Sequence, residues 1–200
     1  IQNIMRAKFL ALAALVLGLA SCQTDTVNGV KVDANGEAPV TIQVGLPEDV
    51  TRAAGNDSAK GAIGNIDLEN TYDIRYVLNV YDKDGKLAKG PITEFQDEAT
   101  SQSFSLRLVP GRYYKFVVWA DFVAQGSDED LNYNTTDLKN ITRTGDVSPM
   151  DECMDAYFIQ KSIELNSTLK KDLVLTRPFG KIRVIATDAN EVNIGSTPAK

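Results

Sequence analysis

The clearest chemistry that this sequence offers is the acylation of a cysteine near its N-terminus. Two positive charges in Met5-Arg6-Ala7-Lys8 precede the uncharged, apolar segment 9–20. That segment is shorter than the roughly 20 residues of a transmembrane helix and has the length of a secretion-signal core. It ends in Leu19-Ala20-Ser21-Cys22, in which an aliphatic and two small residues precede a thiol. This spacing is typical of a bacterial lipobox and predicts a lipoprotein signal peptide over residues 1–22, with the lipid on Cys22.

The second cysteine, Cys153, is not expected to be a nucleophile. Cys22 and Cys153 are the only cysteines of the sequence, and it contains no histidine. Cys–His and Ser–His catalysis and histidine-based zinc sites are therefore excluded. With Cys22 acylated, we expect Cys153 to be a small buried apolar residue. The alternative is an ordinary signal peptide in which Cys22 is incidental, and the residues alone leave it open.

The charge balance argues against nucleic acid as a partner. The sequence has 27 acidic and 21 basic residues, a net charge of −6, and two of the basic residues, Arg6 and Lys8, lie in the predicted signal peptide. The remainder is more acidic still, whereas nucleic-acid binding needs a basic surface. An acidic surface instead suits a soluble domain that faces outward from a cell.

No metal, cofactor or catalytic constellation is predicted. Oxygen-bearing side chains alternate from Asp128 to Asn134, as in a calcium-binding loop. Tyr133 occupies the position that needs glycine, and Lys139 the position that needs a bidentate glutamate. A solvated acidic loop is therefore the favoured interpretation. Nothing singles out two carboxylates for glycoside hydrolysis, so we expect the protein not to be an enzyme.

Short strand patterns fill the chain beyond a polar segment. Residues 23–39 contain two Asn-Gly turns and are interpreted as a flexible tether. Period-2 alternation and turn signals then predict strands at 40–46, 72–81, 86–95, 103–108, 113–122, 156–159, 162–165, 172–176 and 181–187. Gly90-Pro91 marks one of them as an edge strand. Without a long amphipathic helix, this pattern predicts an antiparallel β-sandwich over residues 40–188. Residues 189–200 are interpreted as a linker that could begin a second domain.

The loop after the first predicted strand carries a candidate processing site. Arg52-Ala53 lies among small polar residues, where trypsin-like proteases cut. Cleavage there would release the preceding strand, whose alternating residues are Val40, Ile42, Val44 and Leu46. The groove left behind could accept a strand from another chain. From these residues alone, an ordinary exposed loop arginine is the favoured interpretation of Arg52.

Three aromatic residues raise the alternative of sugar binding. Tyr113, Trp119 and Tyr133 would stack on a sugar if they were exposed. Core packing is the favoured interpretation for aromatic residues in strands. An exposed aromatic platform would support a surface lipoprotein that binds glycans or proteins and does not polymerise.

Several motifs, taken together and in order, resemble a known family. They are "LASC", "VTIQVGLPEDVTRAAG", "YDIRYVLNVYDKDGKL", "LVPGRYYKFVVWADF", "DLNYNTTDLKNI" and "RPFGKIRVIATD". The sequence resembles the fimbrillin-like lipoproteins of Bacteroidetes, which are subunits and anchors of type V pili. The resemblance implies a transthyretin-like Greek-key sandwich, the N-terminal one of two such domains. It also implies export to the outer membrane, cleavage at the position of Arg52-Ala53, and strand exchange between subunits that builds an adhesive fibre.

The sequence departs from that family pattern in one respect. Family members continue into a second sandwich domain that carries the donor strand, whereas this sequence ends at Lys200 and is expected to be either a fragment or a reduced form. The resemblance also does not decide between a fibre subunit and an anchor that keeps its lipid. The expected function is therefore a cell-surface lipoprotein that acts in fimbria assembly and adhesion. Its expected partners are the outer membrane, through the lipid, and other pilus subunits, through strand addition.

Overall fold

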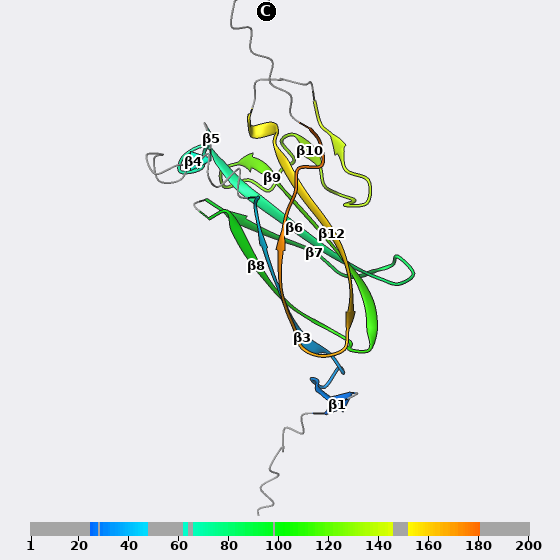
Figure 1. Ribbon diagram of the computed structural model, residues 1–200. Helices are drawn as coiled ribbons and strands as arrows, with labels where there is room; N and C mark the ends of the chain where they lie inside the picture. Colours follow the sequence, from blue (N-terminus) through cyan, green and yellow to red (C-terminus); the bar gives the residue numbers. More distant parts are fainter. Residues whose placement is uncertain are drawn as a thin grey trace, which may run out of the picture.

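The computed structural model describes residues 25–27, 29–47, 62–63, 66–97, 99–145 and 152–180. They form two β-sheets that face each other, with smaller hairpins at both ends of the molecule (Figure 1). The predicted signal peptide at 1–22, the predicted processing site Arg52-Ala53, the strand expected at 181–187 and the expected linker at 189–200 lie outside these residues. Within the described ranges, no helix has the length and apolar content to cross a bilayer.

The larger sheet has four antiparallel strands in the order β12-β9-β6-β7. Their bounds are Ala156–Leu165 for β12, Arg112–Ala124 for β9, Tyr72–Asp82 for β6 and Leu87–Gln96 for β7. Because β7 lies at the end of this order, the edge position predicted from Gly90-Pro91 is confirmed. The β6–β7 turn contains Gly85 at a φ of 77°, a conformation that glycine adopts without strain.

The smaller sheet has three strands in the order β13-β3-β8. Their bounds are Leu169–Val174 for β13, Ala38–Gly45 for β3 and Ser101–Leu108 for β8. The chain passes from β7 to β8 in this sheet and then returns to β9, beside β6 in the other sheet. The all-β Greek-key sandwich is thereby confirmed, with one departure from antiparallel pairing, because β13 runs parallel to β3.

The apolar core lies between the two sheets because alternate residues of each strand face inward. Its fully buried side chains include Ile42 of β3, Phe104 of β8, Tyr76 and Leu78 of β6, and Phe116, Val118 and Phe122 of β9. Tyr114, Phe116, Val118 and Ala120 of β9 lie on this inner face. Cys153 is 6% exposed and belongs to the same core, which confirms its expected burial.

The outer face of the four-stranded sheet carries a second, smaller core. The segment after β9 folds back over it and contains the short hairpin of β10, Tyr133–Asn134, and β11, Thr142–Arg143. Tyr133 and Leu138 of this segment pack against Val77, Val117 and Trp119 of the sheet. This cover explains why β6 and β9 are buried on both faces over much of their length.

The remaining differences from the predicted elements are local. Strand β12 is one continuous strand rather than two short ones, because it pairs with β9 along its whole length. Residues 137–140 form a hydrogen-bonded turn, in which the Asn140 amide donates to the Asp137 carbonyl at 2.9 Å. Among the residues that the structure describes, the helical element is the 3-10 turn Glu152–Met154. Strand β13 ends two residues earlier than expected, although Thr176 still bridges to Phe158. The hairpin β4–β5, Ala62–Ile63 and Ile66–Asp67, was not predicted.

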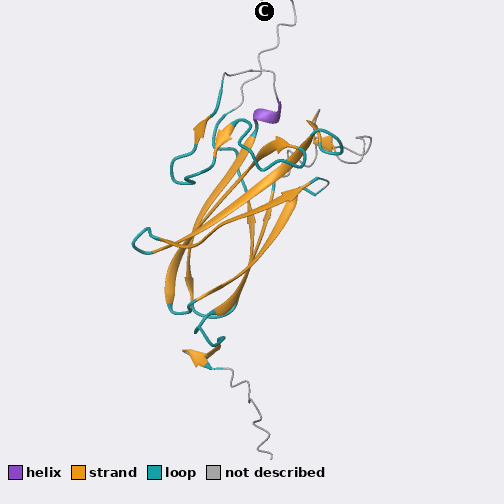
Figure 2. Cartoon of the chain, turned by 180° about the vertical axis from the view of Figure 1, so that it is seen from behind, coloured by secondary structure: helices purple, strands orange, loops and turns teal. Residues whose placement is uncertain are grey.

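The segment interpreted as a tether also contains local structure. Strands β1, Thr26–Val27, and β2, Val30–Lys31, form a hairpin. Val30 and Val32 pack with Ala38, the first residue of β3. Strand β3 begins two residues before the predicted Val40. The N-terminal hairpin and the residue after it pack against this first residue of the strand. Figure 1 labels β1 at one end of the sandwich and β10 at the other, and Figure 2 shows the same arrangement from behind.

Candidate functional site

The predicted exchange strand is the central strand of the smaller sheet. Its inward-facing residues Val40, Ile42, Val44 and Leu46 are 1%, 0%, 0% and 5% exposed. The burial alternates strictly along β3, as the sequence pattern predicts for a strand with one face in the core. The structure thus brings all four predicted residues together in the main core.

Both neighbours of β3 depend on it for their backbone pairing. Ile42 is opposite Phe104 of β8 in the antiparallel ladder and opposite Lys171 of β13 in the parallel one. Beyond the ladders, the Leu46 amide donates to the Thr100 carbonyl at 2.9 Å, and the Gly45 carbonyl accepts from the Leu175 amide at 2.9 Å. Removal of β3 would therefore leave β8 and β13 separated, each with unpaired backbone groups that face the gap.

The energetic cost of such a removal is comparable with the stability of a whole domain. Burying one Val, Leu or Ile side chain contributes about 1.5–3 kcal/mol, so the four inward residues of β3 contribute roughly 6–12 kcal/mol. Domains of this size are typically stable by about 5–15 kcal/mol. A chain that lost β3 would therefore need another strand in the same place to keep its fold.

The start of β3 is fastened to β8 by polar side chains. Arg107 Nε donates to Asp33 Oδ2 at 2.6 Å, and Arg107 Nη2 donates to the Glu37 carbonyl at 2.9 Å. Asp33 Oδ1 also accepts from the amides of Asn35 and Glu37, both at 2.9 Å. The Glu37 amide, together with Asn35 and Arg107, lowers the pKa of Asp33 against a smaller effect of burial. These contacts hold the N-terminal hairpin against the sheet at the entry to β3.

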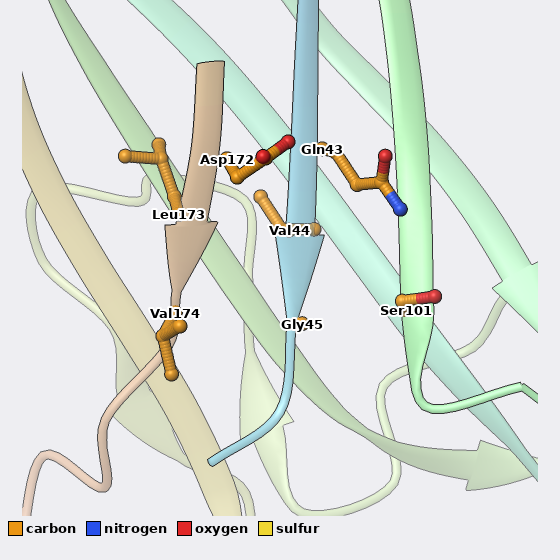
Figure 3. A pocket seen from close by; sticks show the side chains of 7 residues that line it. All are labelled: Gln43, Val44, Gly45, Ser101, Asp172, Leu173 and Val174. Carbon is orange, nitrogen blue, oxygen red and sulfur yellow. The ribbon is translucent and has the colours of Figure 1, made fainter. Parts of the chain in front are cut away.

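The other end of β3 borders a shallow pocket of about 250 Å³ on the outer face of the smaller sheet. Gln43 and Ser101 lie on one side of it and Asp172 and Val174 on the other, while Gly45 contributes no side chain between them (Figure 3). The chain leaves the sheet here toward the segment that carries Arg52. The outer face of β3 is therefore accessible at its C-terminal end, although its inner face is buried.

A buried ion-pair network on the four-stranded sheet was not predicted from the sequence. Arg75 of β6 and Asp121 of β9 are 3% and 1% exposed, and they are paired across the ladder. Arg75 also reaches the loop after β9, where Nη1 donates to Asp130 Oδ1 at 2.8 Å and to the Asp128 carbonyl at 3.3 Å. Burial raises the pKa of Asp121, against the opposing effect of Arg75. The network fixes that loop to the outer face of the sheet.

The three aromatic residues considered for sugar binding lie in different environments. Trp119 and Tyr133 are 4% and 6% exposed, and their rings meet edge to face with centroids 5.1 Å apart. Core packing, the favoured interpretation, is therefore confirmed for both. Tyr113 is 58% exposed, and its hydroxyl donates to Glu164 Oε2 at 2.9 Å. Phe95, an exposed aromatic residue of β7, was not singled out from the sequence.

The acidic loop after β9 does not gather metal ligands. Asp130 accepts from Arg75 and from the Thr135 hydroxyl, at 2.8 and 3.1 Å. Among the described residues, no group of three or more acidic or cysteine side chains is placed to hold a metal ion. The sequence offered no signal for the pairing of Arg75 with Asp121, because 46 residues separate them in the chain.

Comparisons with known proteins identify a family without an assigned function. No curated protein matches the chain. A crystal structure from Bacteroides thetaiotaomicron, described as "putative polysaccharide binding proteins (DUF1812)", matches with 12% sequence identity and a TM-score of 0.34. The match covers 70% of this chain and 47% of that one, so the chain spans about half the length of that solved protein. This likeness is too distant to carry an argument about function. The family model of DUF6562 matches residues 28–198, and the chain therefore belongs to this family of unknown function.

Proposed function

We propose that the protein is an exported, lipid-anchored subunit of the fimbrillin type that acts in pilus assembly and cell adhesion through β-strand exchange. Cys22 carries the lipid and tethers the precursor to the outer membrane. Cleavage after Arg52 frees β3, and a strand of another subunit takes its place. The protein's activity is assembly, without catalysis and without a cofactor.

The position of β3 is the observation that carries this proposal. It is the first strand of the sandwich in the chain, it is central in its sheet, and its inner face is buried. A single cut between it and β4 would separate it covalently from the rest of the sandwich. Main-chain hydrogen bonds to β8 and β13 would then supply affinity for an incoming strand, and apolar side chains at alternate positions would set its register.

The membrane anchor and the processing site are supported by sequence alone. Cys22 follows the lipobox pattern, and Arg52 lies six residues beyond Leu46, the buried core residue that directly follows β3. The family resemblance supports the same two roles. Neither residue belongs to the described part of the chain, so their roles rest on these patterns.

The N-terminus of the mature protein tests the proposal directly. The full chain is expressed in a Bacteroidetes host, and mass spectrometry identifies the N-terminus in membranes and in material sheared from the cell surface. We expect acylated Cys22 in the membrane fraction and Ala53 in the sheared fraction. The variant Arg52→Gln should abolish the Ala53 terminus, whereas Arg112→Gln, which alters an exposed arginine of β9, should not.

Two other outcomes would contradict parts of the proposal. A chain found only in membranes with acylated Cys22 would exclude a fibre subunit and leave an anchor or a non-polymerising binding lipoprotein. An unmodified Cys22 in every fraction would exclude the lipid anchor.

A further inference from the structure

A second pocket opens on the outer face of the four-stranded sheet, away from β3. Its volume is about 440 Å³, within the range of about 300–1,000 Å³ that is typical of small-ligand sites. Val77 lies in its floor, Pro91, Thr93 and Phe95 line it from β7, and the loop after β9 forms the facing wall. None of these residues takes part in the proposed strand exchange.

The pocket exists because the loop covers only part of the sheet. Tyr133 and Leu138 pack over Val77 and Trp119, on β6 and β9. The outer face of the edge strand β7 stays uncovered beside this packing, and the Phe95 side chain is 37% exposed there. The result is a partly apolar surface bordered by a polar wall.

The polar wall presents hydrogen-bond acceptors rather than a free positive charge. The Arg75 guanidinium lines the pocket, but its Nε, Nη1 and Nη2 atoms already donate to Asp121 and Asp130. Asp128 and Asp130 also line the pocket, and both residues are exposed. Because the acidic groups outnumber the single cation, an anionic ligand would be repelled.

Hydroxyl groups complete the wall. Thr93, Thr135 and Thr136 line the pocket. The Thr135 hydroxyl already donates to Asp130 and can only accept from a ligand, whereas the hydroxyls of Thr93 and Thr136 can both donate and accept. A ligand that suits this pocket therefore needs several hydroxyl donors for the carboxylates. It also needs an apolar face that can cover the Phe95 ring, because burying the surface of an aromatic ring favours binding. A pyranose combines these two properties in one small, rigid ring.

We propose that this pocket binds a neutral saccharide of one or two rings. The apolar face of a ring lies against Phe95, and its hydroxyls donate to Asp128 and Asp130 and exchange hydrogen bonds with the threonines. The Arg75 ion pairs hold the carboxylate wall in place. The proposal extends beyond pilus assembly, because it gives the surface a ligand class and does not depend on cleavage at Arg52.

Amide chemical-shift mapping on the uncleaved full chain tests the site. The probes are maltose, cellobiose, lactose and xylobiose, each titrated to about 10 mM, with n-butylammonium as a mimic of a lysine side chain. We expect at least one disaccharide to shift the amides of Thr93, Phe95 and Thr135. Phe95→Ala should weaken that binding at least about 10-fold, and Tyr113→Ala, which removes an exposed ring outside the pocket, should leave it unchanged.

A second variant keeps the test decisive if Phe95→Ala disturbs the edge strand. Thr136→Val removes one pocket hydroxyl at nearly constant volume and should also weaken the sugar without altering the unbound spectrum beyond its neighbours. The proposal is wrong if none of the four sugars produces shifts at the pocket. It is equally wrong if n-butylammonium alone binds there, because the pocket would then be a cation site. Either result leaves the N-terminal mapping of Cys22 and Arg52 unaffected.

Discussion

The guanidinium of Arg75 and the carboxylate of Asp121 meet in a two-point contact inside the protein. Arg75 Nε donates to Asp121 Oδ1 at 2.9 Å and Nη2 to Asp121 Oδ2 at 2.7 Å, with both side chains almost fully buried. Such a pair is costly to desolvate, but the loss of one partner leaves the other charge uncompensated. The contact therefore fixes the relative positions of β6, β9 and the loop that Arg75 also holds.

Removal of the Asp121 carboxylate should destabilise the protein strongly. We expect Asp121→Ala to lower the free energy of unfolding by about 3 kcal/mol, because Arg75 would keep only Asp130 as a charged partner. Asp84→Ala is the matched control, since Asp84 and Lys83 pair on the surface at 70% and 74% exposure. That control should cost less than about 1 kcal/mol. Urea unfolding measures the free energy of unfolding of both variants. Equal losses in Asp121→Ala and Asp84→Ala would contradict a structural role for the buried pair.

The contacts of Asp33 should give the protein a pH-dependent contribution to stability. Because the pKa of Asp33 in the fold lies below its usual 3.8, the ionised form stabilises the folded state. This stability is present above pH 3.8 and is lost as the pH falls through the lower pKa of the folded state. We expect wild type to be more stable than Asp33→Asn near neutral pH, and the difference to shrink below pH 3.8. A difference that stays constant down to pH 2 would contradict the shift.

The two faces of β3 should respond differently to truncation. Ile42→Ala removes a side chain that is 0% exposed, and we expect a loss of about 3 kcal/mol in the free energy of unfolding. Gln43→Ala, the next residue on the outer face, should change it by less than about 0.5 kcal/mol. Chemical denaturation of the uncleaved chain compares the two variants. Similar losses of unfolding free energy in the two variants would mean that the buried side chains of β3 do not stabilise the fold more than its exposed ones.

Strand β7 should require glycine at position 90, where its pairing with β6 has a register irregularity. Gly90 has a φ of +109°, and a Cβ there would come within 2.6 Å of the Leu78 carbonyl oxygen and 2.7 Å of Asn79 Oδ1. Gly85 has a φ of +77°, and a Cβ added to Gly85 would have no other atom within 4 Å. Gly85→Ala should therefore cost about 1–2 kcal/mol for its backbone conformation alone, and Gly90→Ala more. Thermal unfolding of the two variants tests this order, and the reverse order would contradict it.

Local patterns were sufficient to predict most of the strands, because a strand with one buried face imposes a period of two on its own sequence. Strands β3, β8 and β9 were predicted within a few residues for this reason. Strand β12 was divided in two because its middle residues Gln160 and Lys161 are polar, and its continuity comes from pairing with β9. The parallel pairing of β13 with β3 joins distant segments, and no local pattern specifies it.

The candidate site was predictable to the extent that it lies on one strand. The alternation of apolar residues from Val40 to Leu46 predicts the buried face of β3 without reference to its neighbouring strands. The sugar pocket was not predictable, because Phe95, Val77 and Asp130 come from three separate elements. The sequence around Phe95 does not distinguish it from a buried aromatic residue of a strand. It is exposed because the loop after β9 covers only part of the sheet.

Strand exchange itself should be reproducible with a peptide. After cleavage at Arg52 in vitro, a labelled peptide of residues 38–47 should compete for the groove between β8 and β13, because it carries the buried face that the groove requires. A control peptide with aspartate in place of Ile42 and Val44 keeps the length and the backbone but places two charges in the core.

Fluorescence anisotropy and unfolding temperature provide the two measurements. We expect the native peptide to bind only the cleaved protein, where it displaces the released β3 segment. In excess it should raise the unfolding temperature, because a ligand that binds only the folded state stabilises that state by mass action. The control peptide should do neither. Binding of the native peptide to the uncleaved chain as well would place it at an exposed edge strand, and equal binding of the two peptides would show that apolar register does not select the incoming strand.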